Sequence, residues 1–188
     1  MTLLPLNQVF LLLGSNRGER VENLEKARQA IAAQAGKIIQ TSSFYESEPW
    51  GFEDEILFIN QVLEISTRLG AEELLKVLLE IEKSLGRTRP ASDICDLPSA
   101  PVKSGSPPRS GIRPPGYSAR TLDLDILFFG DQILFTENLM IPHPRLHERR
   151  FTLEPLHEIA PDLIHPILKK TVRELLACCM DRSKVRIL

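Results

Sequence analysis

The sequence predicts an α+β fold of the ferredoxin-like kind, a βαββαβ sandwich in which helices pack on an antiparallel sheet. Three observations lead to this class. Four short segments are apolar or alternate with a period of two, which is the pattern of strands. Two longer segments carry apolar residues along one helical stripe. Their order along the chain is strand, helix, strand, strand, helix, strand, which is the split βαβ arrangement.

The first strand is expected over Val9 to Leu13, because this run is almost wholly apolar. It should end at the turn sequence Gly14-Ser15-Asn16. The same reasoning gives the other elements: a helix over 20–35 ended by Gly36, strands over 37–45 and 57–67, a helix over 71–85 ended by Gly86, and a strand over 121–129.

A segment rich in Pro, Gly and Ser, residues 90–116, separates the second helix from the last of these strands. Such a composition cannot bury enough apolar surface to fold alone, so we expect a long, mobile loop. From Arg87 to Arg120 the chain holds six basic and two acidic residues, which makes the loop and its flanks basic. A short hairpin strand at 133–135 and C-terminal helices near 145–159 and 171–180 complete the prediction.

Composition and charge exclude several classes of protein. The formal net charge of -2 provides no basic field for nucleic acid or an anionic membrane. Cys95, Cys178 and Cys179 lack the spacing of a metal clip, so we expect reduced thiols in a cytoplasmic protein. The first fourteen residues have no basic n-region, and polar residues interrupt their apolar run, which argues against a signal peptide or membrane span. We expect one domain over 1–188 that acts as a monomer.

The strand over 121–129 carries two aspartates, Asp123 and Asp125, where a buried strand should be apolar. Strict alternation places Thr121, Asp123, Asp125, Leu127 and Phe129 on one face and Leu122, Leu124, Ile126 and Phe128 on the other. The first face becomes apolar at its end, so the aspartates are expected at the rim of the core. Two carboxylates about 6–7 Å apart along a strand suit Mg²⁺ that shares phosphate oxygens.

The alternative for an isolated Asp-x-Asp pattern is a solvated face or pairing with arginines, and this alternative is the more common one. The basic loop beside the strand favours the metal-binding interpretation over the solvated one. Arginine forms bidentate bonds to phosphate oxygens, so carboxylates and arginines together favour a nucleotide triphosphate.

A set of motifs in this chain occurs in the order of one known family. They are GSN at 14–16, SSFYESEPWG at 42–51, FIN at 58–60, GRTR at 86–89, RTLDLDIL at 120–127 and IPHPRLHERRF at 141–151. Through them the chain resembles the 6-hydroxymethyl-7,8-dihydropterin pyrophosphokinase family of folate biosynthesis over about residues 8–165. The resemblance implies a ferredoxin-like fold and transfer of the β,γ-diphosphate of ATP to the hydroxymethyl group of the pterin, with release of AMP.

The resemblance also implies roles for single residues. Asp123 and Asp125 would hold two Mg²⁺ ions and would act with Arg87 and Arg89 as the catalytic residues. The residues that bind ATP would be Arg87, Arg89, Arg120, Ile126, His143 and Arg149. Without the family, His143 between two prolines would be interpreted as a turn residue and Arg149 as part of a solvated helix face.

The pterin side of the implied site combines aromatic rings with an amide. A flat heterocycle needs ring faces above and below it and a hydrogen-bonding partner at its edge. The resemblance assigns this ligand to Ser47, Pro49, Trp50, Phe58, Asn60 and Phe151. Phe58 or Phe151 alone would more often be a core residue, whereas an amide on an inward strand face, as at Asn60, needs a partner.

The chain departs from the family in two places. Tyr117-Ser118-Ala119 stands where the family often has Trp-Gly-Pro, so Tyr117 is a candidate replacement for a lid tryptophan. The loop 90–116 is also longer than the family leads us to expect.

Four alternatives belong to other functional classes. An RNA-recognition domain would need exposed aromatic residues on a basic sheet, and here the aromatic share is 6%. A regulatory ferredoxin-like domain would need neither the arginines nor the aspartates. A nucleotidyltransferase would release pyrophosphate in place of AMP. A zinc site is disfavoured because Pro144 lies between His143 and His147 and would disturb a helix there.

Overall fold

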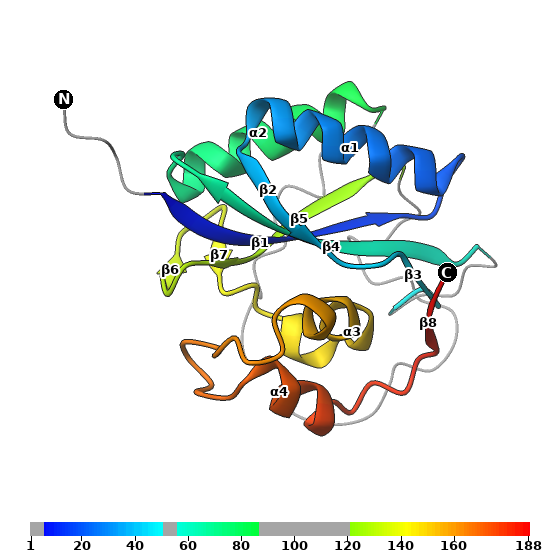
Figure 1. The fold of residues 1–188 in the computed structure, drawn as a ribbon, viewed down its shortest axis with the longest axis vertical. Coiled ribbons are helices and arrows are strands. Elements are labelled where there is room, and N and C mark those ends of the chain that lie inside the picture. Colours follow the sequence, from blue (N-terminus) through cyan, green and yellow to red (C-terminus); the bar gives the residue numbers. More distant parts are fainter. Residues whose placement is uncertain (1–5, 51–55, 87–120) are drawn as a thin grey trace.

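The computed structural model of the chain describes residues 6–50, 56–86 and 121–188. Its centre is a six-stranded antiparallel sheet in the order β5-β1-β4-β3-β8, with β2 paired to β4 beside this path. Figure 1 shows α1 and α2 on one face of the sheet and α3 and α4 on the other. The first elements are β1 (Asn7–Ser15), α1 (Arg20–Gln34), β2 (Lys37–Thr41), β3 (Tyr45–Ser47), β4 (Phe58–Thr67) and α2 (Ala71–Ser84).

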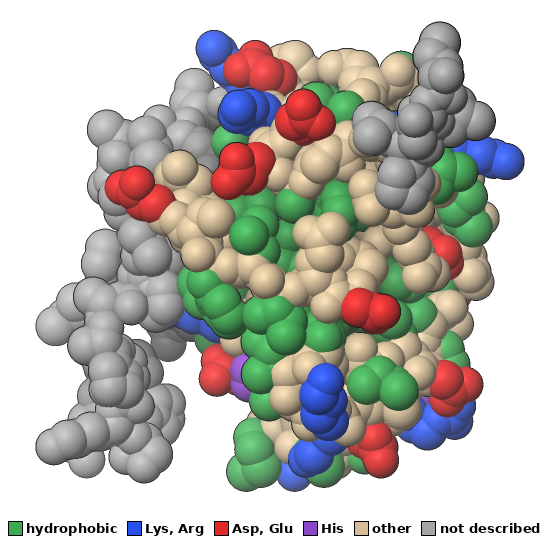
Figure 2. All heavy atoms as spheres, turned by 90° about the vertical axis from the view of Figure 1, so that its left-hand side faces the viewer, with side chains coloured by type: hydrophobic (Ala, Val, Ile, Leu, Met, Phe, Trp, Pro, Cys, Tyr) green, Lys and Arg blue, Asp and Glu red, His purple; other side chains and the backbone are tan. Residues whose placement is uncertain are grey.

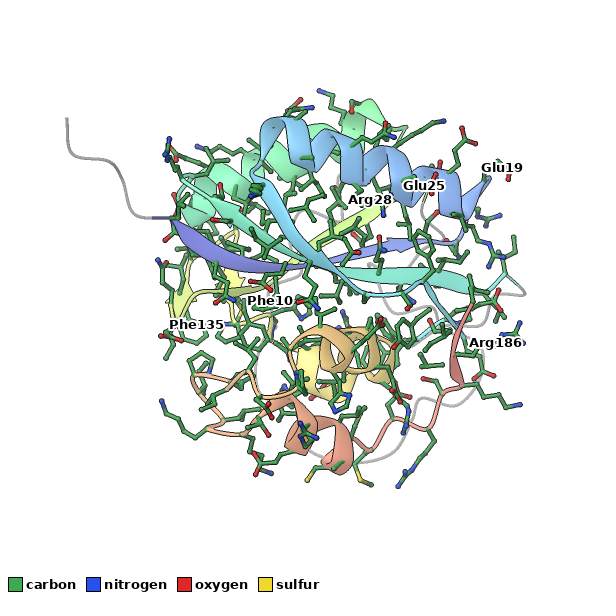
Figure 3. All side chains as sticks on the ribbon, in the orientation of Figure 1. Phe10, Glu19, Glu25, Arg28, Phe135 and Arg186 are labelled. Carbon is green, nitrogen blue, oxygen red and sulfur yellow. The ribbon has the colours of Figure 1, made fainter. Side chains whose placement is uncertain are left out.

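The C-terminal part of the chain contributes the last sheet strands and the second helical layer. Its elements are β5 (Asp123–Phe129), β6 (Leu134–Phe135), β7 (Met140–Ile141), the 3₁₀ helix η2 (Leu146–Glu148), α3 (Arg150–Ile159), α4 (Val172–Cys178) and β8 (Val185–Ile187). The strands β6 and β7 form a separate hairpin. Phe135 on this hairpin is 62% exposed and points away from the molecule in Figure 3.

The predicted ferredoxin-like order is confirmed, with one strand divided in two. The segment 37–45 forms β2 and β3, and both pair with β4. Ser42 lies between them, and its Oγ accepts a hydrogen bond from the Val62 amide at 2.9 Å, so a side chain takes the place of a ladder contact. The strand β8 was not predicted, because three residues of alternating polarity near a chain end carry little strand signal.

The central strand β1 is buried from Val9 to Ser15 because both of its faces are covered. Val9, Leu11 and Leu13 pack with α1 and α2, for which Leu24 and Ile31, and Leu74, Leu78 and Ile81, supply the apolar stripes. Phe10 and Leu12 point to the opposite cluster, which includes Leu153 and Leu156 of α3 and Val172 and Leu175 of α4. The fold therefore has two hydrophobic layers, one on each face of the sheet.

The strict alternation predicted for β5 is wrong at its C-terminal end. The register pairs Leu11 with Ile126 but Phe10 with Phe128, so Leu127 is the extra residue of a β-bulge. After the bulge the faces exchange. Phe128 packs with the α3 and α4 cluster, and Phe129 packs with the α1 and α2 cluster, which is the reverse of the prediction.

Two observations concern the surface of the described residues. On the face drawn in Figure 2, basic and acidic side chains are scattered among hydrophobic ones, as the small net charge leads one to expect. Within the ranges that the structure describes, no helix combines the length and apolar character needed to cross a membrane.

Candidate active site

A row of residues crosses the sheet at one end and brings the predicted pterin and metal residues together. Gly14 of β1 pairs with Asn60 of β4 on one side and with Asp123 of β5 on the other. A Cβ built on Gly14 would lie 3.3 Å from Asn60 Oδ1, 4.0 Å from Asp123 Cβ and 4.0 Å from Phe58 Cδ1. Gly14 therefore provides the space in which these three side chains meet.

Gly14 itself was assigned to a turn from the sequence, and that assignment is wrong, because β1 continues through Ser15. A glycine that follows an apolar run and precedes Ser-Asn is typical of the end of a strand, which is why the sequence favours a turn at Gly14. The available signal was the glycine within a strand, which marks a close approach to the backbone.

The two aspartates lie on the α3 side of the sheet, as the alternation before the bulge predicts. Asp123 and Asp125 are half-buried, whereas Leu124 between them packs under α1 and α2. β5 is at the edge of the sheet, and its Leu124 amide donates to the carboxylate of Glu82 at 2.8 Å. Glu82 is 1% exposed, so this bond covers the outer side of the strand that carries the aspartates.

The donor set at this position suits Mg²⁺ more than a transition metal. Among the described residues there is no group of three or more His, Cys, Asp or Glu side chains that could hold a metal ion. Asp123 and Asp125 would supply oxygen ligands only, and Mg²⁺ takes its remaining ligands from water and phosphate. The two carboxylates therefore fit ions that bind together with a polyphosphate.

The pterin-side residues on β3 and β4 are linked by a buried hydrogen bond. Asn60 Nδ2 donates to Ser47 Oγ at 2.9 Å, and both residues are at most 2% exposed. Ser47 pairs with Phe58 in the register of the two strands, and the Phe58 ring is half-buried. The bond fixes the carboxamide, so that its Oδ1 points toward Gly14.

Arg149 contacts two aromatic rings that the family resemblance assigns to the pterin. Its Cζ is 4.9 Å from the centroid of the Trp50 ring and 5.7 Å from that of Phe151, both within the range of cation–π contact. Arg149 is 8% exposed and directly precedes α3, which begins at Arg150. The residue assigned to ATP thus contacts two residues assigned to the pterin, while Pro49 is half-buried next to Trp50 in the sequence.

His143 is attached to the β5 bulge. Its amide donates to the Leu127 carbonyl at 3.0 Å, and its Nδ1 accepts from the Arg145 amide at 3.2 Å. Burial, and after it the charge of Arg149, lowers the pKa of His143 to about 3, although the charge of Asp123 acts in the opposite direction. The imidazole is therefore neutral at physiological pH, and it lies close enough to Asp123 to sense that charge.

Of the remaining predicted residues, the structure describes only Ile126. The side chain of Ile126 is 4% exposed and belongs to the core under α1 and α2, on the face of the sheet opposite the aspartates. Arg87, Arg89 and Arg120, like Tyr117 and the loop 90–116, lie outside the described residues.

Comparison with known proteins agrees with these motifs. The family model described as 7,8-dihydro-6-hydroxymethylpterin-pyrophosphokinase matches residues 10–98 and 107–161. The Aquifex aeolicus protein named 2-amino-4-hydroxy-6-hydroxymethyldihydropteridine pyrophosphokinase is 34% identical over 166 residues, which cover 88% of each chain. The Bacillus subtilis protein of the same name is 37% identical over 154 residues, which cover 81% of this chain and 78% of the relative.

Longer relatives and solved structures match as well. The folic acid synthesis protein fol1 of Pneumocystis carinii is 38% identical over 85% of this chain, which spans only 18% of that protein. Wild-type HPPK-DHPS of Plasmodium falciparum with STZ-DHP superposes with a TM-score of 0.69 at 18% identity, over 92% of this chain and 43% of that one. At that identity the superposition supports the fold.

Proposed function

This chain belongs to the 7,8-dihydro-6-hydroxymethylpterin-pyrophosphokinase family, and we infer that it is a pyrophosphokinase of folate biosynthesis. It transfers the β,γ-diphosphate of ATP to the hydroxymethyl group of 6-hydroxymethyl-7,8-dihydropterin and releases AMP. The observation that carries this function is the row of Asn60, Gly14 and Asp123 across the sheet. Gly14 has no side chain, so it leaves a space between the fixed amide of Asn60 and the carboxylate of Asp123.

In the proposed site the pterin lies against this gap. The carboxamide of Asn60, held by Ser47, meets the hydrogen-bonding edge of the heterocycle. The rings of Phe58 and Phe151 stack on its faces. Pro49 and Trp50 form the rim, and Trp50 is already in contact with Arg149.

The triphosphate lies between the aspartates and the basic residues. Arg149 provides a fixed guanidinium for phosphate oxygens, and the neutral His143 provides a hydrogen bond without adding charge. Arg87, Arg89 and Arg120 are proposed to neutralise the remaining negative charge of the triphosphate. Ile126 is proposed to act only through its backbone, because its side chain lies in the core on the other face.

Asp123 and Asp125 are proposed to hold two Mg²⁺ ions together with the phosphate oxygens. When bound, these ions would supply Lewis acidity and neutralise the charge of the triphosphate. The protein residues then orient the two substrates for in-line transfer, which requires placement and charge neutralisation more than covalent chemistry. The aspartates set the position of the charge, and the pterin pocket sets the position of the hydroxymethyl group.

The enzyme is further proposed to act as a cytoplasmic monomer, with residues 1–188 as one domain that binds small molecules and no nucleic acid. Light scattering after size-exclusion chromatography tests the oligomeric state, and a mass near 21.2 kDa is expected.

Product analysis tests the proposed reaction. Incubation with ATP, Mg²⁺ and 6-hydroxymethyl-7,8-dihydropterin should yield AMP and the pterin diphosphate in equal amounts. AMP formation that is no faster with the pterin than without it would exclude the reaction. Release of pyrophosphate would indicate a nucleotidyltransferase.

A further inference from the structure

A buried carboxylate lies behind the pterin side of the site, on the opposite face of β3. The side chain of Glu46 is 8% exposed and points away from the face that carries Ser47, because the two are neighbours in a strand. Arg186 donates to Glu46 Oε2 from its Nε at 2.9 Å and also from its Nη2. Arg20 Nη1 donates to Oε1 at 3.2 Å. These bonds, those from Arg186 above all, hold the pKa of the Glu46 carboxyl below its usual range.

The same cluster reaches the beginning of β4. Arg20 Nη1 also donates to the carbonyl oxygen of Leu57 at 2.7 Å. Leu57 directly precedes Phe58, which begins β4 and supplies a ring to the proposed pterin pocket. Arg20 is the first residue of α1, so one guanidinium connects this helix to β3 and to the start of β4.

Arg186 connects the cluster to the C-terminal strand. Glu46 and Arg186 are paired in the register of β3 and β8, and Figure 3 shows Arg186 at the side of the molecule where β8 lies. β3 has only three residues, and β8 covers the edge that it would otherwise expose. The placement of β3 therefore depends on contacts outside its own short ladder.

The position of the pterin-binding groups follows from the position of β3 and β4. Ser47 pairs with Phe58, and its Oγ holds the carboxamide of Asn60. A shift of β3 or of the Leu57 carbonyl would move all three of these residues. His143 and Arg149 lie on a different part of the chain, after β7 and before α3.

We propose that Arg20 and Arg186 are positioning residues for the pterin pocket, which act through Glu46 and the carbonyl of Leu57. Neither guanidinium touches a substrate in this proposal. Their loss lowers affinity for the pterin and leaves the binding of ATP unchanged. The inference rests on the proposed function, because the pterin is the ligand whose binding is measured.

Steady-state kinetics of the full chain tests the proposal, with AMP formation measured while each substrate is varied in turn. Arg20→Ala and Arg186→Ala are compared with Arg173→Ala. The control suits the purpose because Arg173 is also a paired surface arginine, at 3.1 Å from Asp162, and its side chain is 61% exposed. Arg20→Lys keeps the charge, but its ammonium lies one bond closer to the backbone than Arg20 Nη1, so it should reach the Glu46 and Leu57 oxygens less well.

The expected result is a rise in the pterin KM of about five- to tenfold in both alanine variants, which is less than the loss of a charge-assisted hydrogen bond made to the ligand itself, because the two arginines act indirectly. The ATP KM and kcat should stay within about twofold of wild type, and Arg20→Lys should give an intermediate pterin KM. The Arg173→Ala control should match the wild type throughout.

Three outcomes would overturn the inference. An unchanged pterin KM in both alanine variants would remove the positioning role. Equal rises in both KM values, together with a lower thermal midpoint, would indicate a general structural role. A rise in the control of the same size would indicate an effect of surface charge. If the wild-type protein forms no AMP in response to the pterin, the proposed function fails first, and that result is distinct from all three.

Discussion

Replacement of Gly14 by alanine should weaken pterin binding while the folded state stays almost equally stable. The new Cβ would lie 3.3 Å from Asn60 Oδ1 and 4.0 Å from Asp123 Cβ. Gly14 is not among the described glycines with positive φ, so alanine can adopt the backbone conformation of β1 without strain. The substitution therefore adds one methyl group to the gap and changes little else.

The expected effects on stability and on binding have different sizes. A contact of 3.3 Å requires the Asn60 carboxamide to shift by a few tenths of an ångström. Crowding of this kind costs on the order of 1 kcal/mol, and alanine recovers about 0.4–1 kcal/mol by restricting the unfolded chain. Binding should have no such compensation, because the methyl group would occupy the space proposed for the pterin and would displace the Asn60 amide. A loss of about 10- to 100-fold in kcat/KM for the pterin is expected.

The assay pairs two measurements on the same variant. AMP formation is followed with the pterin varied at saturating ATP, and the free energy of unfolding is obtained from urea titration. Gly70→Ala is the matched control, because its Cβ would meet Glu73 Oε2 at an ordinary 3.7 Å. A wild-type pterin KM in the Gly14 variant, or an equal loss of affinity for both substrates, would refute the reasoning.

Three further predictions address the metal site, the pH dependence and the packing. Asp125→Asn should reduce turnover, measured as AMP release, by at least about 100-fold while stability stays unchanged. The control Asp131→Asn, at an exposed turn, should keep wild-type activity. Equal rates in the two variants would contradict the assignment of Asp125 to the metal. Burial, and after it the charge of His147, lowers the pKa of His165 to about 4, so stability should fall by up to about 3 kcal/mol from pH 6.5 to 4, where only the unfolded chain binds that proton. His165→Asn should flatten this slope in urea titrations at pH 7 and pH 4.5, and an unchanged slope would count against it. Gly36→Ala should lower the free energy of unfolding by about 2 kcal/mol or more without a selective loss of pterin affinity, because its Cβ would meet a carbonyl oxygen of β4 at 2.5 Å. An unfolding midpoint equal to that of the wild type would contradict this contact.

The fold could be predicted because its signals are local and strong. The apolar run of β1 and the stripe of Leu74, Leu78 and Ile81 in α2 each report a period that depends only on neighbouring residues. The division of the second strand was not predictable, since it depends on the Ser42 hydroxyl reaching the Val62 amide, twenty residues away.

The site shows the same distinction. The Asp123 and Asp125 pair can be recognised from the sequence alone, because charged residues are rare within an apolar strand. The contact of Arg149 with the Trp50 ring brings together segments about a hundred residues apart, and no spacing in the sequence encodes it. The cluster around Glu46 was missed for the same reason, since its arginines come from α1 and β8.

The bulge at Leu127 divides β5 into two parts with opposite phase. Before it, odd-numbered positions face α3; after it, even-numbered positions do. A scan of polar substitutions along the strand should therefore show its tolerance pattern reverse between Ile126 and Phe128. The carbonyl of Leu127 accepts a hydrogen bond from the amide of His143. One additional residue thus sets the packing of two phenylalanines and anchors the loop of His143, for which we propose a role in ATP binding, so its deletion should disturb both the core and the proposed site.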